Sequence, residues 1–69
     1  MMTVSAQVKQ TIASLKGTRA TLESFADIEQ NDQAEQILYK NITRLEGVIK
    51  DMENRLSVLE FEEPQYKGF

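Results

Sequence analysis

The second half of this chain carries one continuous apolar stripe, and that stripe limits what the chain can fold into. Its members are separated alternately by four and three residues: Leu38, Ile42, Leu45, Ile49, Met52, Leu56 and Leu59. This alternation places all of them at the a and d positions of a heptad, on one side of a helix of about six turns. A single helix leaves such a stripe in water, so the rest of the chain or another copy must cover it.

The first half carries a weaker stripe of the same kind. Apolar residues recur there at helical spacing: Val4, Val8, Ile12, Leu15, Leu22 and Phe25. Arg19 occupies an a position of this stripe, where its stem can lie along the seam with the charged head at the edge. Its head can also pair with an acid across the seam. The pattern predicts a first helix over about residues 4–29.

A turn is expected between the two stripes, at residues 30–32. The segment Glu-Gln-Asn-Asp ends there, and Asn and Asp compete with helix through local side-chain hydrogen bonds. Asp32 followed by Glu35 resembles a capping box and predicts that a second helix begins at about residue 33. That helix is expected to continue to about residue 60, supported by i,i+4 ion pairs of Glu46 with Lys50 and of Asp51 with Arg55.

A connection this short makes the two helices antiparallel neighbours. The predicted fold is therefore all-α: a single domain over residues 1–69, built as an antiparallel two-helix hairpin with an extended C-terminal tail over residues 61–69. A chain of 69 residues lies near the lower size limit for independent folding, and two helices leave each stripe half covered. We therefore predict a homodimer or larger homo-oligomer in a four-helix bundle, with the seven residues of the second stripe as its interface.

The C-terminal tail is rich in aromatic residues, because it contains three of the five aromatics of the chain. Pro64 favours extended backbone around itself. Two interpretations stay open for Phe61, Pro64, Tyr66 and Phe69. These residues either clip back over the open end of the stripe, or they form a short linear motif for a protein partner.

Gly17 and Gly47 fall near the middle of their predicted helices, on outer f positions. Each costs about 1 kcal/mol relative to alanine. Either both are tolerated there, or they form a notch against which a partner packs. A track of small residues, Ala6, Ala13 and Ala20, runs beside Gly17 and has the same two interpretations.

Composition excludes several classes of function. The chain has no cysteine and no histidine, so it lacks thiolates, the commonest metal ligand and the commonest general base. Its net charge of −3 disfavours binding to nucleic acid. It contains no calcium loop, phosphate-binding glycine loop or nucleophile elbow. We expect a non-enzymatic protein with no catalytic, cofactor-binding or metal-binding residues, no cofactor and no small-molecule substrate. With no apolar run near the roughly 20 residues of a membrane span and no signal-like start, the expected location is cytoplasmic.

Three segments together resemble a known family: TVSAQVKQTIASLKG at residues 3–17, TRLEGVIKDMENRL at residues 43–56 and EFEEPQYKGF at residues 60–69. The most specific parts are Val8-Lys9-Gln10 and the ending over residues 62–68. The family consists of short proteins from spore-forming bacilli and is called domain of unknown function 1657. The resemblance implies a sporulation context, because members are associated with gene clusters for spore-membrane channel proteins of the dipicolinic-acid transport type and with spore resistance. It also implies a spore membrane protein as partner and a location in the spore core or at the periphery of the spore inner membrane. It implies no catalytic residues.

The function expected from these features is that of a non-enzymatic structural or interaction protein. One alternative is a phosphatase-like signalling regulator. Short hairpin regulators of sporulation depend on a Ser-x-x-Leu-Asp motif, which Ser57-Val58-Leu59-Glu60 loosely resembles. Another alternative is an amphipathic protein at a membrane surface, which would require a polar face rich in Lys and Arg. The second predicted helix instead carries more acids than bases.

Overall fold

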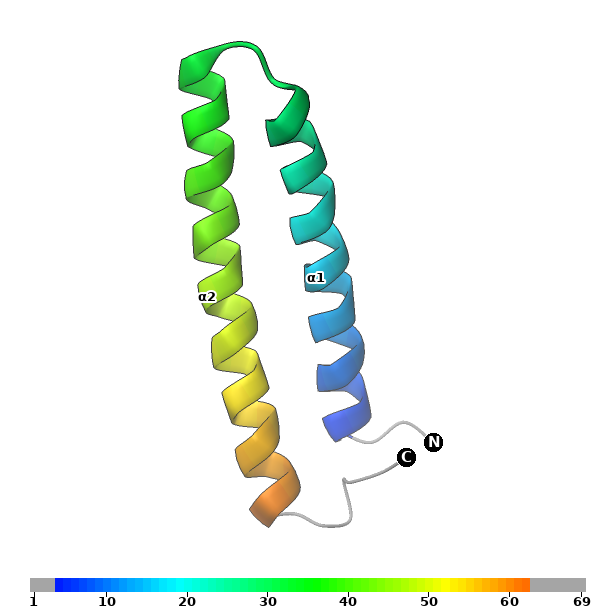
Figure 1. Cartoon of the computed structure of the whole chain (residues 1–69). Helices are drawn as coiled ribbons and strands as arrows, with labels where there is room; N and C mark the ends of the chain where they lie inside the picture. The colour runs from blue at the N-terminus through cyan, green and yellow to red at the C-terminus, as the bar shows by residue number, and fades with distance from the viewer. Residues whose placement is uncertain (1–3, 63–69) are drawn as a thin grey trace.

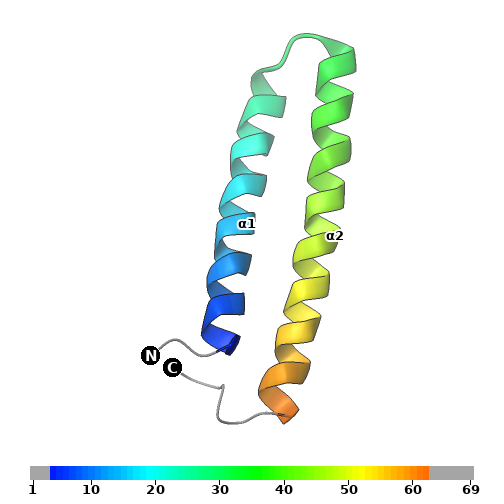
Figure 2. The same cartoon turned by 180° about the vertical axis from the view of Figure 1, so that it is seen from behind.

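The computed structural model describes residues 4–62 as two helices joined by a short connection (Figure 1). Helix α1 spans Val4–Ile28 and helix α2 spans Asp32–Glu62. The helices lie side by side from the connection downwards in both views (Figures 1 and 2), within Cα extents of 49 × 19 × 10 Å. The described residues contain no strand. The predicted all-α antiparallel hairpin is therefore confirmed.

Helix α2 begins with a side-chain cap. The Oδ1 atom of Asn31 accepts a hydrogen bond from the backbone N–H of Ala34 at 3.0 Å, and its carbonyl accepts one from Glu35 at 2.9 Å. The cap was predicted at Asp32 and is one residue earlier, because Asn31 offers the same chemistry and precedes it. Asp32 and Glu35 instead lie in the first turn, where the helix dipole favours carboxylates.

The connection over residues 29–31 is stabilised mainly by hydrogen bonds among its own residues. The carboxylate of Glu29 accepts hydrogen bonds from the backbone N–H groups of Gln30 at 3.1 Å and Asn31 at 3.0 Å. The N–H of Glu29 donates to the carbonyl of Ala26 at 3.3 Å, which closes the last turn of α1. Glu29 thus accepts from two N–H groups of the connection, and the Ala26 carbonyl is one of the acceptors that the C-terminal end of a helix would otherwise leave without a partner.

The C-terminal end of α2 lies further along the chain than predicted. Phe61 was placed in the extended tail, which is wrong, because α2 continues through it to Glu62. A proline at position 64 disfavours helix for the residue before it and leaves residues 61 and 62 free to be helical. The Phe61 side chain is 85% exposed and does not cover the stripe. Pro64, Tyr66 and Phe69 lie outside the described residues.

The hydrophobic core is one row of a positions along the seam between the helices. Its buried apolar members are Ile12 and Ala26 from α1 and Ile42 and Ile49 from α2. Ser5 is buried in the same row near the start of α1. The d positions of both helices are only half-buried. A single chain thus buries five of its a positions, while Arg19 and Leu56 of the same row and the d rows of both helices are half-buried.

Alanine at Gly17 or at Gly47 is expected to stabilise the hairpin by about 1 kcal/mol, because each lies inside a helix where glycine is the more flexible residue. A methyl group at either position meets nothing within 4 Å in the part of the chain that the structure describes. Thermal unfolding followed by circular dichroism measures the change. A lower melting temperature for either variant would contradict the absence of neighbours at these glycines. It would favour the interpretation that Gly17 and Gly47 form a notch against which a partner packs.

Candidate interaction site

One side of the hairpin is an apolar face that residues 4–62 leave partly exposed. It combines half-buried d residues with more exposed apolar neighbours: Val8, Leu15, Leu22, Leu38, Leu45, Met52 and Leu59, flanked by Val4, Phe25 and Val48. The flanking side chains are 45%, 54% and 49% exposed, respectively. Because they occupy g positions, which adjoin d on the helix surface, the two sets form one continuous surface. We call these ten residues the apolar face.

The part of the apolar face contributed by α1 adjoins no charged side chain on its outer flank. Turning away from the seam beyond the d row, α1 presents uncharged residues such as Thr11, Thr18 and Phe25. All charged residues of α1 lie on the opposite side of its d row: Lys9, Lys16, Arg19, Glu23 and Asp27. The helix thereby separates its charges from its apolar residues.

The opposite side of the seam is a charged edge, defined by ion pairs between e positions of the two helices. Lys9 Nζ lies 3.0 Å from Glu60 Oε2. One heptad further along α1, Lys16 Nζ lies 3.0 Å from Glu53 Oε2. Each step of seven residues forward in α1 matches seven backward in α2, as antiparallel helices require. These pairs therefore mark the register of the hairpin.

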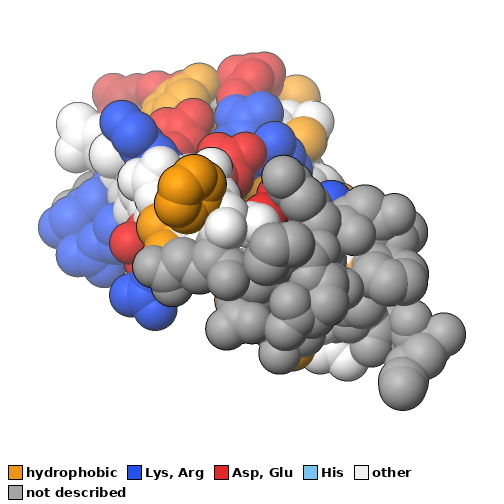
Figure 3. All heavy atoms as spheres, turned by 90° about the horizontal axis from the view of Figure 1, so that it is seen from below, with side chains coloured by type: hydrophobic (Ala, Val, Ile, Leu, Met, Phe, Trp, Pro, Cys, Tyr) orange, Lys and Arg blue, Asp and Glu red, His pale blue; other side chains and the backbone are white. Residues whose placement is uncertain are grey.

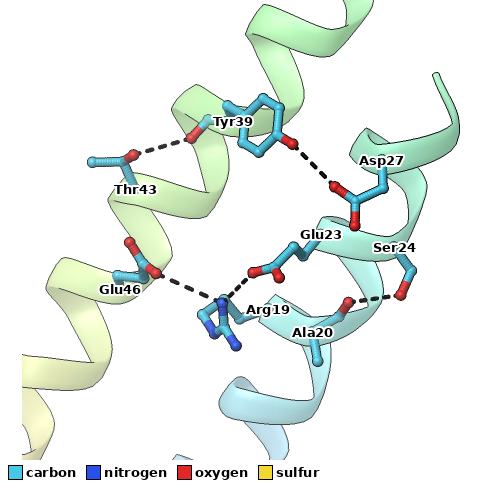
Figure 4. Close-up of polar contacts among 8 residues, drawn as sticks. All are labelled: Arg19, Ala20, Glu23, Ser24, Asp27, Tyr39, Thr43 and Glu46. Atoms are coloured by element: carbon cyan, nitrogen blue, oxygen red, sulfur yellow. Dashed lines mark hydrogen bonds and ion pairs between the residues drawn. The ribbon is translucent and has the colours of Figure 1, made fainter. Parts of the chain in front are cut away.

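At the next step of the charged edge, two glutamates take the e positions, and Arg19 lies between them (Figure 4). Arg19 Nη1 lies 2.7 Å from Glu23 Oε2 and 3.7 Å from Glu46 Oε2. The arginine is half-buried at the seam and also pairs across it, so the structure combines both arrangements that the sequence left open. Its positive charge separates two carboxylates that would otherwise repel each other.

The two ion pairs predicted within α2 have different outcomes. Arg55 Nε lies 3.0 Å from Asp51 Oδ2, so that pair is formed. Glu46 instead reaches across the seam to Arg19 and does not pair with Lys50 among the described residues. Competition from a partner on the other helix is the physical reason, because the i,i+4 rule considers one helix alone.

A hydrogen bond from a neutral hydroxyl to a carboxylate continues the charged edge towards the connection. The Tyr39 hydroxyl donates a hydrogen bond to Asp27 Oδ1 at 3.1 Å (Figure 4). This bond raises the pKa of the Tyr39 hydroxyl above its ordinary value, and the nearby negative charges of Glu35 and Glu23 add to the shift. Tyr39 therefore stays neutral over the physiological range and acts as a hydrogen-bond donor between the helices.

The charged edge contains a shallow, open depression of about 500 Å³, lined by Lys16, Arg19, Glu46, Ile49, Lys50 and Glu53. Most of the charged side chains that line it are paired with one another. Within residues 4–62, no three acidic, cysteine or histidine side chains are grouped as metal ligands. The lining of this depression contains no serine, threonine, cysteine or histidine. In the segment that resembles the phosphatase motif, Ser57 is exposed and Glu60 is held by Lys9.

The seven residues predicted as an oligomer interface fall into two groups. Ile42 and Ile49 are 5% and 6% exposed, so burying them requires no second copy. The other five are half-buried: Leu38, Leu45, Met52, Leu56 and Leu59. Sequence reasoning placed Val4 and Phe25 in the stripe of the first helix but not at the oligomer interface, and it did not single out Val48. The g position of Val48, next to d, was the available signal.

The end of the hairpin opposite the connection presents both charged and hydrophobic side chains. Seen from below, acidic and basic side chains lie beside one another, and hydrophobic side chains reach the surface between them (Figure 3). Helix α2 extends past the start of α1 here (Figure 1). Val58 and Phe61 are exposed because they occupy c and f positions, on the side of α2 that faces away from α1.

These features define a small α-helical hairpin with an apolar face on one side and a charged edge on the other. The chain belongs to the family described as protein of unknown function (DUF1657), whose model matches residues 8–56. The family resemblance found in the sequence is thereby confirmed, although the ending over residues 62–68 lies outside the matched range. No curated protein and no solved structure matches the chain. Neither helix, over the residues described, has a stretch apolar enough to cross a membrane.

Proposed function

We propose that this protein is a non-enzymatic structural protein that acts by binding another helical protein through its apolar face. The observation that carries the proposal is the grouping of exposed Val4, Phe25 and Val48 beside half-buried d residues. Scattered surface hydrophobics need no explanation, whereas a continuous apolar surface rimmed by polar residues is typical of an interaction site. Because the residues alternate at heptad spacing, the shape suits packing against other helices.

The proposed setting is sporulation, in which the protein contributes to spore resistance together with a channel protein of the spore membrane. Membership of the family supports this part of the proposal through the resemblance described above. The corresponding location is the spore core or the periphery of the spore inner membrane, where the charged edge would remain in water while the apolar face meets a protein helix.

Replacing Val48 by lysine is expected to abolish capture of the partner from sporulating cells, because it places a charge within the apolar face. Thr43→Lys is the matched control: it changes a β-branched residue of the same helix on the side of the charged edge. Affinity purification of the full chain with quantitative mass spectrometry measures the difference. Spores carrying Val48→Lys should lose resistance as a deletion does, and Thr43→Lys spores should not. Equal capture by both variants, or full resistance of a deletion strain, would refute the proposed function.

A further inference from the structure

We infer that the partner on the apolar face is a second copy of this chain, so that two hairpins stack face to face as a four-helix bundle. This inference rests on the proposed function, because it assumes that the apolar face is a docking surface. It goes further by identifying what docks there. Three properties of the described residues favour a second copy: the area of the face, its charge and its repeat.

The area of the face matches a two-helix partner. The two longer Cα extents of the whole hairpin are 49 and 19 Å, so the broad side that carries the apolar face, its polar residues included, projects over about 930 Å². A specific protein interface buries about 800 Å² on each partner. A single helix is only about 10–12 Å wide with its side chains and would leave much of this width uncovered. A second hairpin has the width required.

The charge distribution permits two identical chains to meet at this face. Each chain has a net charge of −3, so two copies repel each other unless the contact surface is free of like charges. The α1 part of the apolar face adjoins no charged side chain on its outer flank. On α2, Arg55 occupies the neighbouring g position and is paired with Asp51 at 3.0 Å. Face-to-face stacking keeps both charged edges in water.

The repeat of the face makes it complementary to itself. Val8, Leu15 and Leu22 recur every seven residues on α1, and Leu38, Leu45, Met52 and Leu59 recur every seven on α2. A two-fold axis across the face therefore brings rows of equal spacing together, so that the side chains of one copy fit between those of the other. A surface used for self-association must meet this condition, because one patch serves both partners.

Sedimentation equilibrium of the full chain over a micromolar concentration series tests the inference. The wild type is expected to show twice the chain mass of 7.9 kDa. Thr18→Lys is expected to weaken the dimer by about 100-fold or more, because each dimer then contains two like charges in a dry interface. Thr18 lies one helical turn from both Leu15 and Leu22.

Thr43→Lys is the matched control and is expected to leave the dimer unchanged. Both threonines are exposed, and both donate a hydrogen bond at 3.1 Å to the carbonyl four residues earlier. Thr43 lies beside Tyr39 and Glu46 on the charged edge, so the same charge is added on the opposite side. Far-UV circular dichroism of both variants should show unchanged helix content, which separates dimer loss from unfolding.

Three results would overturn the inference. If the wild type is a folded monomer that still captures a different protein through Val48, the proposed function is supported and the inference of a second copy is wrong. A monomer that binds anionic vesicles but no protein removes both. A dimer weakened by Thr43→Lys and untouched by Thr18→Lys places the contact at the charged edge and removes the apolar face from both proposals.

Discussion

Shortening Ile49 to alanine is expected to lower the free energy of unfolding by about 3 kcal/mol. Ile49 is 6% exposed and is one of only four buried apolar side chains in the described residues, so the substitution removes a large part of this core. A chain of this size has only about 3–10 kcal/mol of stability, so the variant loses a large fraction of it. Urea unfolding followed by circular dichroism, at a protein concentration held constant, measures the change.

Val58→Ala is the matched control for this prediction. Val58 lies on the same helix but is 55% exposed. Removing methyl groups from an exposed position changes stability by about 0.5 kcal/mol or less. Comparing Ile49→Ala with Val58→Ala therefore separates the contribution of burial to stability from that of helix propensity. If the two variants lose the same stability, the a row is not the core of the folded protein.

The two helices and their antiparallel arrangement were predictable from the sequence, because the four-three spacing and the Asn-Asp turn are local signals. The spacing places Ile42 and Leu45 on one side of α2 but does not determine how that side is rotated towards α1. The rotation depends on both helices at once. Small Ala26 permits close packing in the a row, and ion pairs close the charged edge, so most of the a row is buried and the d row is half-buried.

The charged edge was only partly predictable for a related reason. Pairing rules within one helix correctly predict Asp51 with Arg55. They miss Glu46, because its partner Arg19 becomes a neighbour only after the hairpin closes. The boundary errors at Asn31 and Phe61 arise from residues that suit either side of a helix end, where assignments commonly differ by one or two residues.

Reversing the two lysines of the charged edge, Lys9→Glu with Lys16→Glu, is expected to lower the free energy of unfolding by about 2 kcal/mol at low salt. The change removes two ion pairs at 3.0 Å and replaces them with two contacts between carboxylates. Each exposed pair contributes about 0.2–1 kcal/mol, and each like-charge contact costs a similar amount. The loss should become smaller as added salt screens the charges. Urea unfolding at low and at high salt measures both effects.

Adding Glu53→Lys and Glu60→Lys to this variant is expected to restore most of the lost stability, because each ion pair is then rebuilt with its signs exchanged. The rescue depends on register: position 9 must face position 60 and position 16 must face position 53. As the control, Lys40→Glu with Arg44→Glu makes the same change in net charge on the outer side of α2 and should have little effect. A fourfold variant as unstable as the double variant would mean that the helices pair in another register in solution. In that case, the separation of the charged edge from the apolar face would not hold.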